Sequence, residues 1–140
     1  MPSEEEAVRY ASECWEKGYN CTESVLRGVC HGLEMELPEV ALKMATPFGG
    51  GVGRSEDLCG ALSGGVLAIG SVLGRTKSEE DRFVSYNAAR DLHDRFQNKF
   101  GSSLCCELNF SDFTSPEHRE RCGNFILETV RTTFRIIRRA

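Results

Sequence analysis

Residues 59–74 have the sequence CGALSGGVLAIGSVLG, which contains no charged side chain. A helix that is apolar on nearly every side is typical of the interior of a protein. Gly60 and Gly64 are four residues apart, as are Ala61 and Gly65, so small residues share a face that another helix can approach closely. A glycine inside a helix costs about 1 kcal/mol relative to alanine, and tight packing is the expected compensation. We therefore expect residues 59–74 to form the central helix of the fold.

The segments on either side predict further helices. Asn20 with Glu23 three residues later predicts a capped helix whose first residue is Cys21. Four other helices are expected. One begins at Ser3, one runs from Pro38 to Ala45, one runs from Ser78 to Gly101, and the last begins at Ser115-Pro116. Residues 49–53 and 102–114 are expected to be loops or short turns, and no segment shows the period of two that is typical of strands. The sequence predicts an all-α protein, a compact bundle of five to six helices.

Size and charge narrow the class of protein. A chain of 140 residues is expected to form one domain over residues 1–140, and its composition of 40% apolar and 27% charged residues is that of a folded chain. The net charge of −4 disfavours a general nucleic-acid binder. There is no run of 18 apolar residues, and the first residues are acidic, unlike a signal peptide. We expect a cytoplasmic protein that neither inserts into membranes nor binds nucleic acid.

Seven cysteines are the most unusual feature of the composition. They are Cys14, Cys21, Cys30, Cys59, Cys105, Cys106 and Cys122. An odd number without an export signal disfavours a secreted disulfide scaffold. No two are spaced as C-x-x-C, so the usual zinc-finger and thioredoxin patterns are absent. Any site must therefore be assembled from distant segments, and the open alternatives are metal ligation, reactive thiols and buried packing.

Four of these cysteines occupy informative positions. Cys21 and Cys59 each fall in the first turn of an expected helix, where the positive end of the helix dipole favours a thiolate. Cys105 lies in an expected loop, and Cys122 lies in the first turns of the last helix. A thiolate is both a nucleophile and a metal ligand, so these positions suit redox or metal chemistry.

Several stretches together resemble the C_GCAxxG_C_C family of redox-active proteins. They are Gly18-Tyr19-Asn20-Cys21, Phe48-Gly49-Gly50-Gly51-Val52-Gly53-Arg54, Cys59-Gly60-Ala61-Leu62-Ser63-Gly64, Cys105-Cys106-Glu107-Leu108 and Cys122. The resemblance spans nearly the whole chain and implies that the functional cysteines are Cys21, Cys59, Cys105 and Cys122. It leaves open whether Cys105 or Cys106 is the third of them. Cys14 and Cys30 fall outside the pattern and are expected in the core.

The resemblance implies redox activity and, through a related four-cysteine module in split-Soret cytochromes, an iron–sulfur cluster. No C-x-x-C-H sequence is present, so covalent haem attachment is not expected. A two-iron or four-iron cluster needs four converging thiolates, and we expect most of the four sulfurs to lie within about 7 Å of one another. The backbones of Gly49, Gly50, Gly51 and Gly60 could approach such a cluster closely. The leading hypothesis is electron transfer through this cluster, to a redox partner that the sequence does not identify.

Other uses of the same residues remain open. Zinc held by the four cysteines would be a structural module, and a dithiol–disulfide pair could use a low-pKa Cys59 as the attacking thiol with Cys21 or another cysteine as its partner. The loop at Gly49–Gly53 lacks the Gly-Lys-Ser/Thr ending of a nucleotide-binding P-loop. His31, His93 and His118 are expected at the surface or in packing. His31 is the expected substitute if one cysteine is not a ligand.

We also expect the chain to associate with a second copy of itself. The helix at 59–74 is apolar nearly all round, and residues 83–100 add Phe83, Tyr86, Phe96 and Phe100 on one expected face. A chain of this size buries only about two-thirds of its unfolded surface, so five or six helices cannot cover both elements fully. An exposed apolar strip usually marks an interface, and a two-fold homodimer is the commonest arrangement.

Overall fold

The computed structural model describes residues 1–140 and contains helices and turns but no strand. Its long helices are α1 (Glu4–Glu16), α2 (Cys21–Gly32), α5 (Gly60–Leu73), α6 (Phe83–Phe100) and α8 (Pro116–Arg139). Its short elements are α3 (Glu39–Ala45), η1 (Thr46–Phe48), α4 (Gly49–Val52) and α7 (Cys105–Leu108). The all-α prediction is confirmed. The expected five to six helices are slightly too few, because α4 and α7 form short helical turns inside segments predicted as loops.

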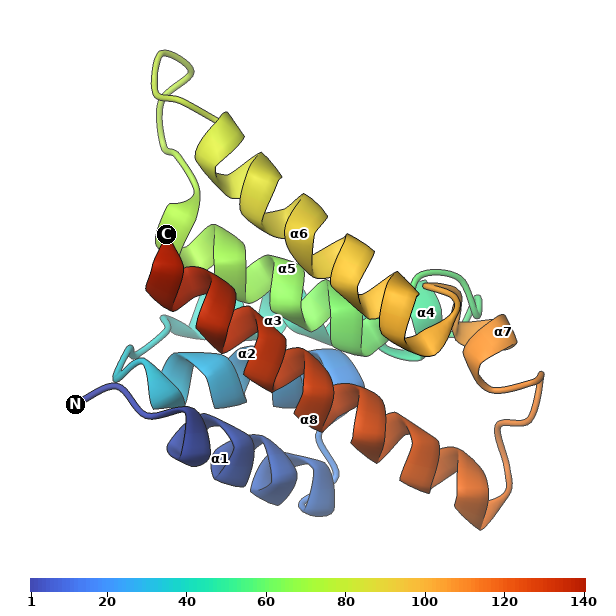
Figure 1. Cartoon of the computed structure of the whole chain (residues 1–140). Coiled ribbons are helices and arrows are strands. Elements are labelled where there is room, and N and C mark those ends of the chain that lie inside the picture. Colours follow the sequence, from blue (N-terminus) through green and yellow to red (C-terminus); the bar gives the residue numbers. More distant parts are fainter.

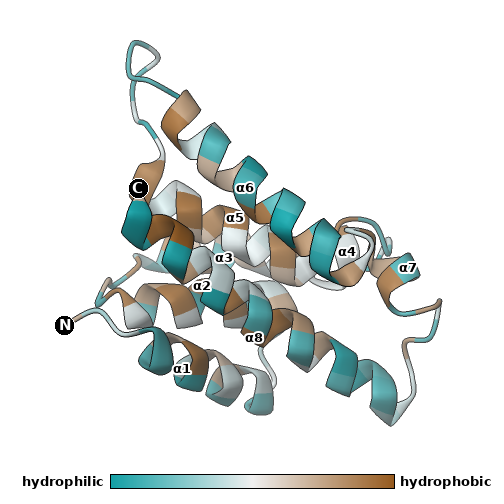
Figure 2. Cartoon of the chain, viewed as in Figure 1, coloured by the Kyte–Doolittle hydropathy of each residue, from teal (hydrophilic) through white to brown (hydrophobic).

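The three other long helices pack around α5 and α8. Helix α5 contacts α2, α6 and α8, and α8 crosses α1, α2, α5 and α6 (Figure 1). Figure 2 shows that α5 is apolar or neutral over its length, whereas the other long helices each carry polar stretches. The largest fully buried apolar side chains are Leu62, Ile69, Leu92, Ile126, Val25, Val29 and Val130. Because α5 contributes Leu62 and Ile69 to this core, its predicted central position is confirmed.

Glycines make the close packing of α5 possible. A methyl group added to Gly64 would lie 2.6 Å from the Thr22 carbonyl oxygen and 2.8 Å from Val25 Cβ in α2. A methyl group added to Gly65 would lie 2.6 Å from Leu92 Cδ2 in α6. Separations below about 3 Å are hard-sphere overlaps, so the two neighbouring glycines let helices approach α5 from two directions.

Local capping signals set most helix starts. The Asn20 side chain accepts from the Glu23 N–H while the Glu23 carboxylate accepts from the Asn20 N–H, so α2 begins at Cys21 as predicted. Ser115 likewise caps α8 by accepting from the His118 N–H.

The expected start of a helix at Ser78 is wrong, since α6 begins at Phe83. The Glu80 carboxylate accepts from the backbone N–H groups of Thr76 and Lys77, and Asp81 accepts from the Phe83 N–H. The acidic run therefore closes a turn before the helix and does not form its first turn.

The expected aromatic face of this helix is only partly buried. Phe96 is buried, with its ring centroid 4.9 Å from that of Phe100 and 6.1 Å from that of Phe125. Phe83 and Tyr86 are 55% and 57% exposed, because the start of α6 projects past the other helices (Figure 1). None of the helices is long and apolar enough to cross a membrane.

Two alanine substitutions in α5 should change stability in opposite directions. Gly64→Ala places a methyl group against the α2 backbone and should lower the free energy of unfolding by about 1–3 kcal/mol. At Gly70 nothing lies within 4 Å of an added methyl group, so Gly70→Ala should raise it by about 0.5–1 kcal/mol. Urea denaturation of both variants measures the difference. Equal stability of the two variants would contradict the proposed close approach of α2 and α5.

Candidate functional site

The N-terminal ends of α2, α5, α7 and α8 gather at one end of the bundle, on the right in Figure 1. Cys21 is the first residue of α2, Cys59 is the residue that caps α5, and Cys105 is the first residue of α7. Cys122 lies within the first two turns of α8. A pocket of about 780 Å³ is lined by Cys21, Cys105 and Cys122. Cys59 does not line it and is 6% exposed, but it is close enough to Cys21 and Cys105 for their charges to affect its pKa.

A short stretch of paired backbone brings Cys59 and Cys105 together. Leu58 and Leu104 form an isolated antiparallel bridge. The Cys59 N–H donates to the Ser103 carbonyl at 2.8 Å, and the Cys105 N–H donates to the Asp57 carbonyl at 2.5 Å. Two segments more than forty residues apart in sequence are thereby held in register at the start of α5.

The predicted glycines lie against the cysteines or at the pocket. A methyl group on Gly60 would overlap Cys21 Sγ, and one on Gly51 would be 2.8 Å from Cys105 Cβ. Gly49 and Gly50 line the pocket. Each position therefore needs a residue without a side chain, or lies where a bound group would contact the backbone. Their role as backbone donors to a cluster stays a prediction.

Residues 50–54, which overlap the end of α4, form a left-handed turn. The φ angles of Gly50, Gly51, Val52, Gly53 and Arg54 are 69°, 73°, 67°, 58° and 64°. The prediction that glycines here allow positive φ is confirmed, but two residues with side chains share that conformation. The left-handed conformation costs roughly 1–2 kcal/mol for an L-residue, and a β-branched residue such as Val52 is a clear outlier there. Because Val52 is 46% exposed, burial of its side chain does not offset this cost.

Asn109 links two of the cysteines and was missed by the sequence analysis. Its side chain is buried, and its Nδ2 donates to the Cys105 carbonyl at 3.1 Å and lies 3.8 Å from Cys105 Sγ. Its Oδ1 lies 3.9 Å from Cys122 Sγ and 3.0 Å from His118 Nδ1, and accepts from Arg121 Nε at 3.3 Å. The signal available in the sequence was the spacing of four between Cys105 and Asn109, which suits one helical turn.

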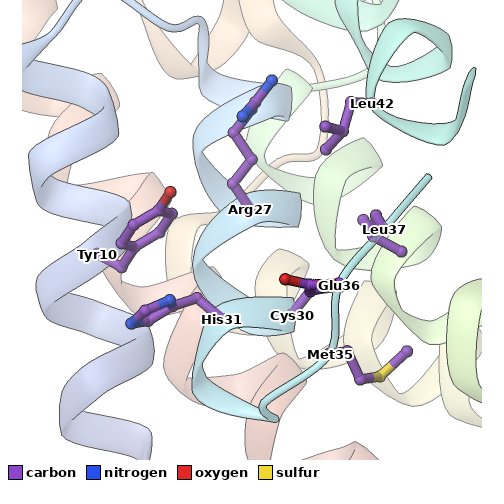
Figure 3. Close-up of a pocket in the computed structure, with 8 residues that line it drawn as sticks. All are labelled: Tyr10, Arg27, Cys30, His31, Met35, Glu36, Leu37 and Leu42. Atoms are coloured by element: carbon purple, nitrogen blue, oxygen red, sulfur yellow. The ribbon is translucent and has the colours of Figure 1, made fainter. Parts of the chain in front are cut away.

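The histidine beside the thiols is His118, not His31. His118 lines the pocket, and its Nδ1 lies 3.8 Å from Cys122 Sγ, four residues later on α8. Burial, and then the charge of Arg121, lower the pKa of His118, which favours the neutral ring. His31 instead stacks on Tyr10 at 4.1 Å between ring centroids and lines a separate pocket of about 360 Å³ (Figure 3). The expectation that His31 is the substitute ligand is therefore wrong, because α2 carries it to the other end of the helix.

Burial raises the pKa of three of the four thiols. The pKa of Cys59 is raised to about 12 by burial and by Cys21, although the N–H groups of Leu62 and Ala61 lower it. Burial and the nearby thiols raise the pKa of Cys122 to about 12 and that of Cys105 to about 11. The expected low pKa of Cys59 is wrong for the free thiol, because desolvation outweighs the N-terminus of α5. A bound cation would lower these pKa values, since coordination to a metal ion deprotonates a thiol.

The remaining cysteines lie outside this constellation. Cys106 is half-buried, does not line the pocket, and donates its N–H to the Glu56 carbonyl at 3.0 Å. Cys14 and Cys30 are buried, as predicted. All seven cysteines are free, and no three His, Cys, Asp or Glu side chains converge closely enough to hold one metal ion. The arrangement offers thiols around and beneath one pocket.

The comparisons with known proteins place the chain in a family. The model of the family described as "Putative redox-active protein (C_GCAxxG_C_C)" matches residues 19–136, so the chain belongs to that family and the predicted resemblance is confirmed. An uncharacterized protein of Archaeoglobus fulgidus is 28% identical over 142 positions, which cover 95% of this chain and 94% of the relative. No solved structure matches the chain.

Replacing Val52 by glycine should stabilise the protein. Val52→Gly removes a strain of about 1–2 kcal/mol, partly offset by about 0.4–1 kcal/mol of added freedom in the unfolded chain, so the melting temperature should rise. The matched control is Val66→Gly, at a valine in α5 that is 38% exposed. There the loss of helix propensity should lower the melting temperature. Thermal unfolding followed by circular dichroism compares them. A fall for both variants would show that Val52 is not strained.

Proposed function

We propose that this protein is a small cytoplasmic redox protein that carries electrons on an iron–sulfur cluster held by Cys21, Cys59, Cys105 and Cys122. The observation that carries the proposal is that four helix starts, each with one of these cysteines, meet at one end of the bundle, where Cys21, Cys105 and Cys122 line one pocket and Cys59 is buried. A bound cluster would supply a reversible one-electron couple. Cluster ligation by four cysteine thiolates is the commonest arrangement, so the donor set fits.

The chain's own residues would tune such a centre. The starts of α2 and α5 direct partial positive charge toward the sulfurs. Asn109 lies 3.8 Å from Cys105 Sγ through an amide nitrogen that can donate, and hydrogen bonds to sulfur and burial both set the reduction potential. Glycine at residue 60 lets the α5 backbone contact Cys21 Sγ directly. These features support a redox role for the site.

Two alternatives use the same cysteines. Four thiolates also suit zinc, which would make the site structural. A thiol–disulfide oxidoreductase needs a thiolate as nucleophile, and the raised pKa of Cys59 weighs against that residue in the attacking role. Cys21 lines the pocket and is only half-buried, so it is the better nucleophile of the two under this alternative.

Metal content and colour test the proposal. Protein purified without oxygen should be brown, with iron and sulfide in equal amounts. Cys105→Ser should lose most of the iron, because removing a ligand or its support lowers metal affinity at least 10–100-fold. Cys106→Ser is the matched control, since Cys106 is adjacent in sequence but does not line the pocket, and it should keep the iron. Colourless protein with one zinc per chain would establish the zinc module, and metal-free protein with a reversible disulfide would establish thiol exchange.

We also propose that the protein is a homodimer. Large apolar side chains remain exposed along α5 and at the start of α6: Val66, Val72, Phe83, Val84 and Tyr86. The exposed start of α6 is apolar in Figure 2, and exposed apolar patches of this kind usually mark interfaces.

Sedimentation equilibrium at micromolar concentration should give twice the chain mass of 15.6 kDa. Phe83→Glu should shift the mass to that of the monomer, because a charge would be buried in the interface. Phe110→Glu is the control, at an aromatic side chain that is 80% exposed elsewhere, and it should leave the mass unchanged. A monomeric wild-type protein would rule out the dimer.

A further inference from the structure

The pocket at the cysteines has room and walls for a small organic molecule. Its volume of about 780 Å³ falls in the range of about 300–1,000 Å³ that is typical of small-molecule sites, and each of the next two pockets measures about 360 Å³. Its lining includes the apolar residues Trp15, Pro47 and Phe113 and the polar residues Asn20, Thr46 and Thr114. Small-molecule sites combine apolar walls with a few polar groups in this way.

Arg54 is a positively charged residue of this pocket that pairs with no other residue of the chain. It lines the pocket and is exposed, and its guanidinium forms no ion pair or hydrogen bond within the chain, not even with Glu56, which also lines the pocket. The two other arginines near this end are engaged. Arg119 lies over the Trp15 ring at 4.3 Å and donates to its carbonyl, and Arg121 pairs with Asp112 at 3.2 Å.

The backbone holds Arg54 at the pocket despite an unfavourable conformation. Arg54 is the last residue of the left-handed turn, with φ of 64°, and its N–H donates to the Gly49 carbonyl at 3.2 Å. A methyl group on Gly50 would lie 2.8 Å from Arg54 Cγ, so Gly50 leaves the space through which the side chain passes. Strained backbone of this kind is concentrated at ligand-binding sites.

We propose that this pocket binds a small organic carboxylate, with the carboxylate on Arg54 and an apolar body against Trp15, Pro47 and Phe113. A guanidinium matches a carboxylate with two parallel hydrogen bonds, and the apolar wall accounts for the rest of the molecule. The inference rests on the proposed function only in one respect: if a redox centre forms at the cysteines, the bound anion would lie beside it.

A pair of probes that differ only in charge tests the binding. Isothermal titration calorimetry of the purified wild-type protein compares naphthalene-2-carboxylate with the uncharged naphthalene-2-carboxamide. A charge-assisted hydrogen bond is roughly twice as strong as a neutral one, so the carboxylate should bind at least about tenfold more tightly. Arg54→Gln should abolish this preference, Arg54→Lys should keep part of it, and Arg138→Gln, at an exposed arginine in the last turn of α8, should leave it unchanged.

Equal affinity of the two probes for the wild-type protein would overturn the proposal, as would an unchanged preference in Arg54→Gln. Thr114→Trp, at an exposed pocket position, should weaken both probes by filling the pocket. Full binding to that variant would place the probes elsewhere and would also overturn it. Iron is measured in the same preparations. Protein that contains iron but does not prefer the carboxylate would reject only the proposed binding site. Protein that prefers the carboxylate but contains no iron would reject only the proposed cluster.

Discussion

Helices α2 and α5 meet at a distance that only glycine permits, and the site depends on that contact. At Gly60 a side chain would overlap Cys21 Sγ, and at Gly64 it would overlap the Thr22 carbonyl. The buried hydroxyl of Thr22 then donates to the Gly60 carbonyl at 2.8 Å, which fixes the two helix starts relative to each other. The same packing that builds the core therefore places Cys21 beside the residue that follows Cys59.

The remaining two cysteines join this pair by different means. Paired backbone at Leu58 and Leu104 holds Cys105, whereas Cys122 comes from α8 and meets Cys105 through the amide of Asn109. Thiols buried together raise one another's pKa, since ionising one disfavours ionising the next. Such a group of thiols is stable as neutral S–H groups or as thiolates around a positive charge. Burial thus disfavours an isolated reactive thiolate at Cys59, Cys105 or Cys122.

Most features that depend on neighbouring residues in sequence could be predicted, whereas the side chains that tertiary contacts bring to the cysteines could not. The capped start of α2, the buried α5 and the start of α8 followed from local patterns. The start of α6 could not be predicted because Ser78-Glu79-Glu80-Asp81 suits a helix cap and a closed turn equally well. His118 and Asn109 each lie four residues from a site cysteine. That spacing is also common in ordinary helix packing, so only the fold distinguishes His118 from His31.

The left-handed turn and the position of Cys105 form one hydrogen-bonded unit. The Asp57 N–H donates to the Gly51 carbonyl, and the Asp57 carbonyl accepts from the Cys105 N–H. Glu56 bridges Gly50 and Cys106 in the same way. An extended or right-handed path through residues 50–54 would turn these carbonyl groups away from α7. The strain at Val52 and Arg54 is thus retained because relieving it would release the segment that carries Cys105, so the local cost is offset by the assembly of the cysteine site.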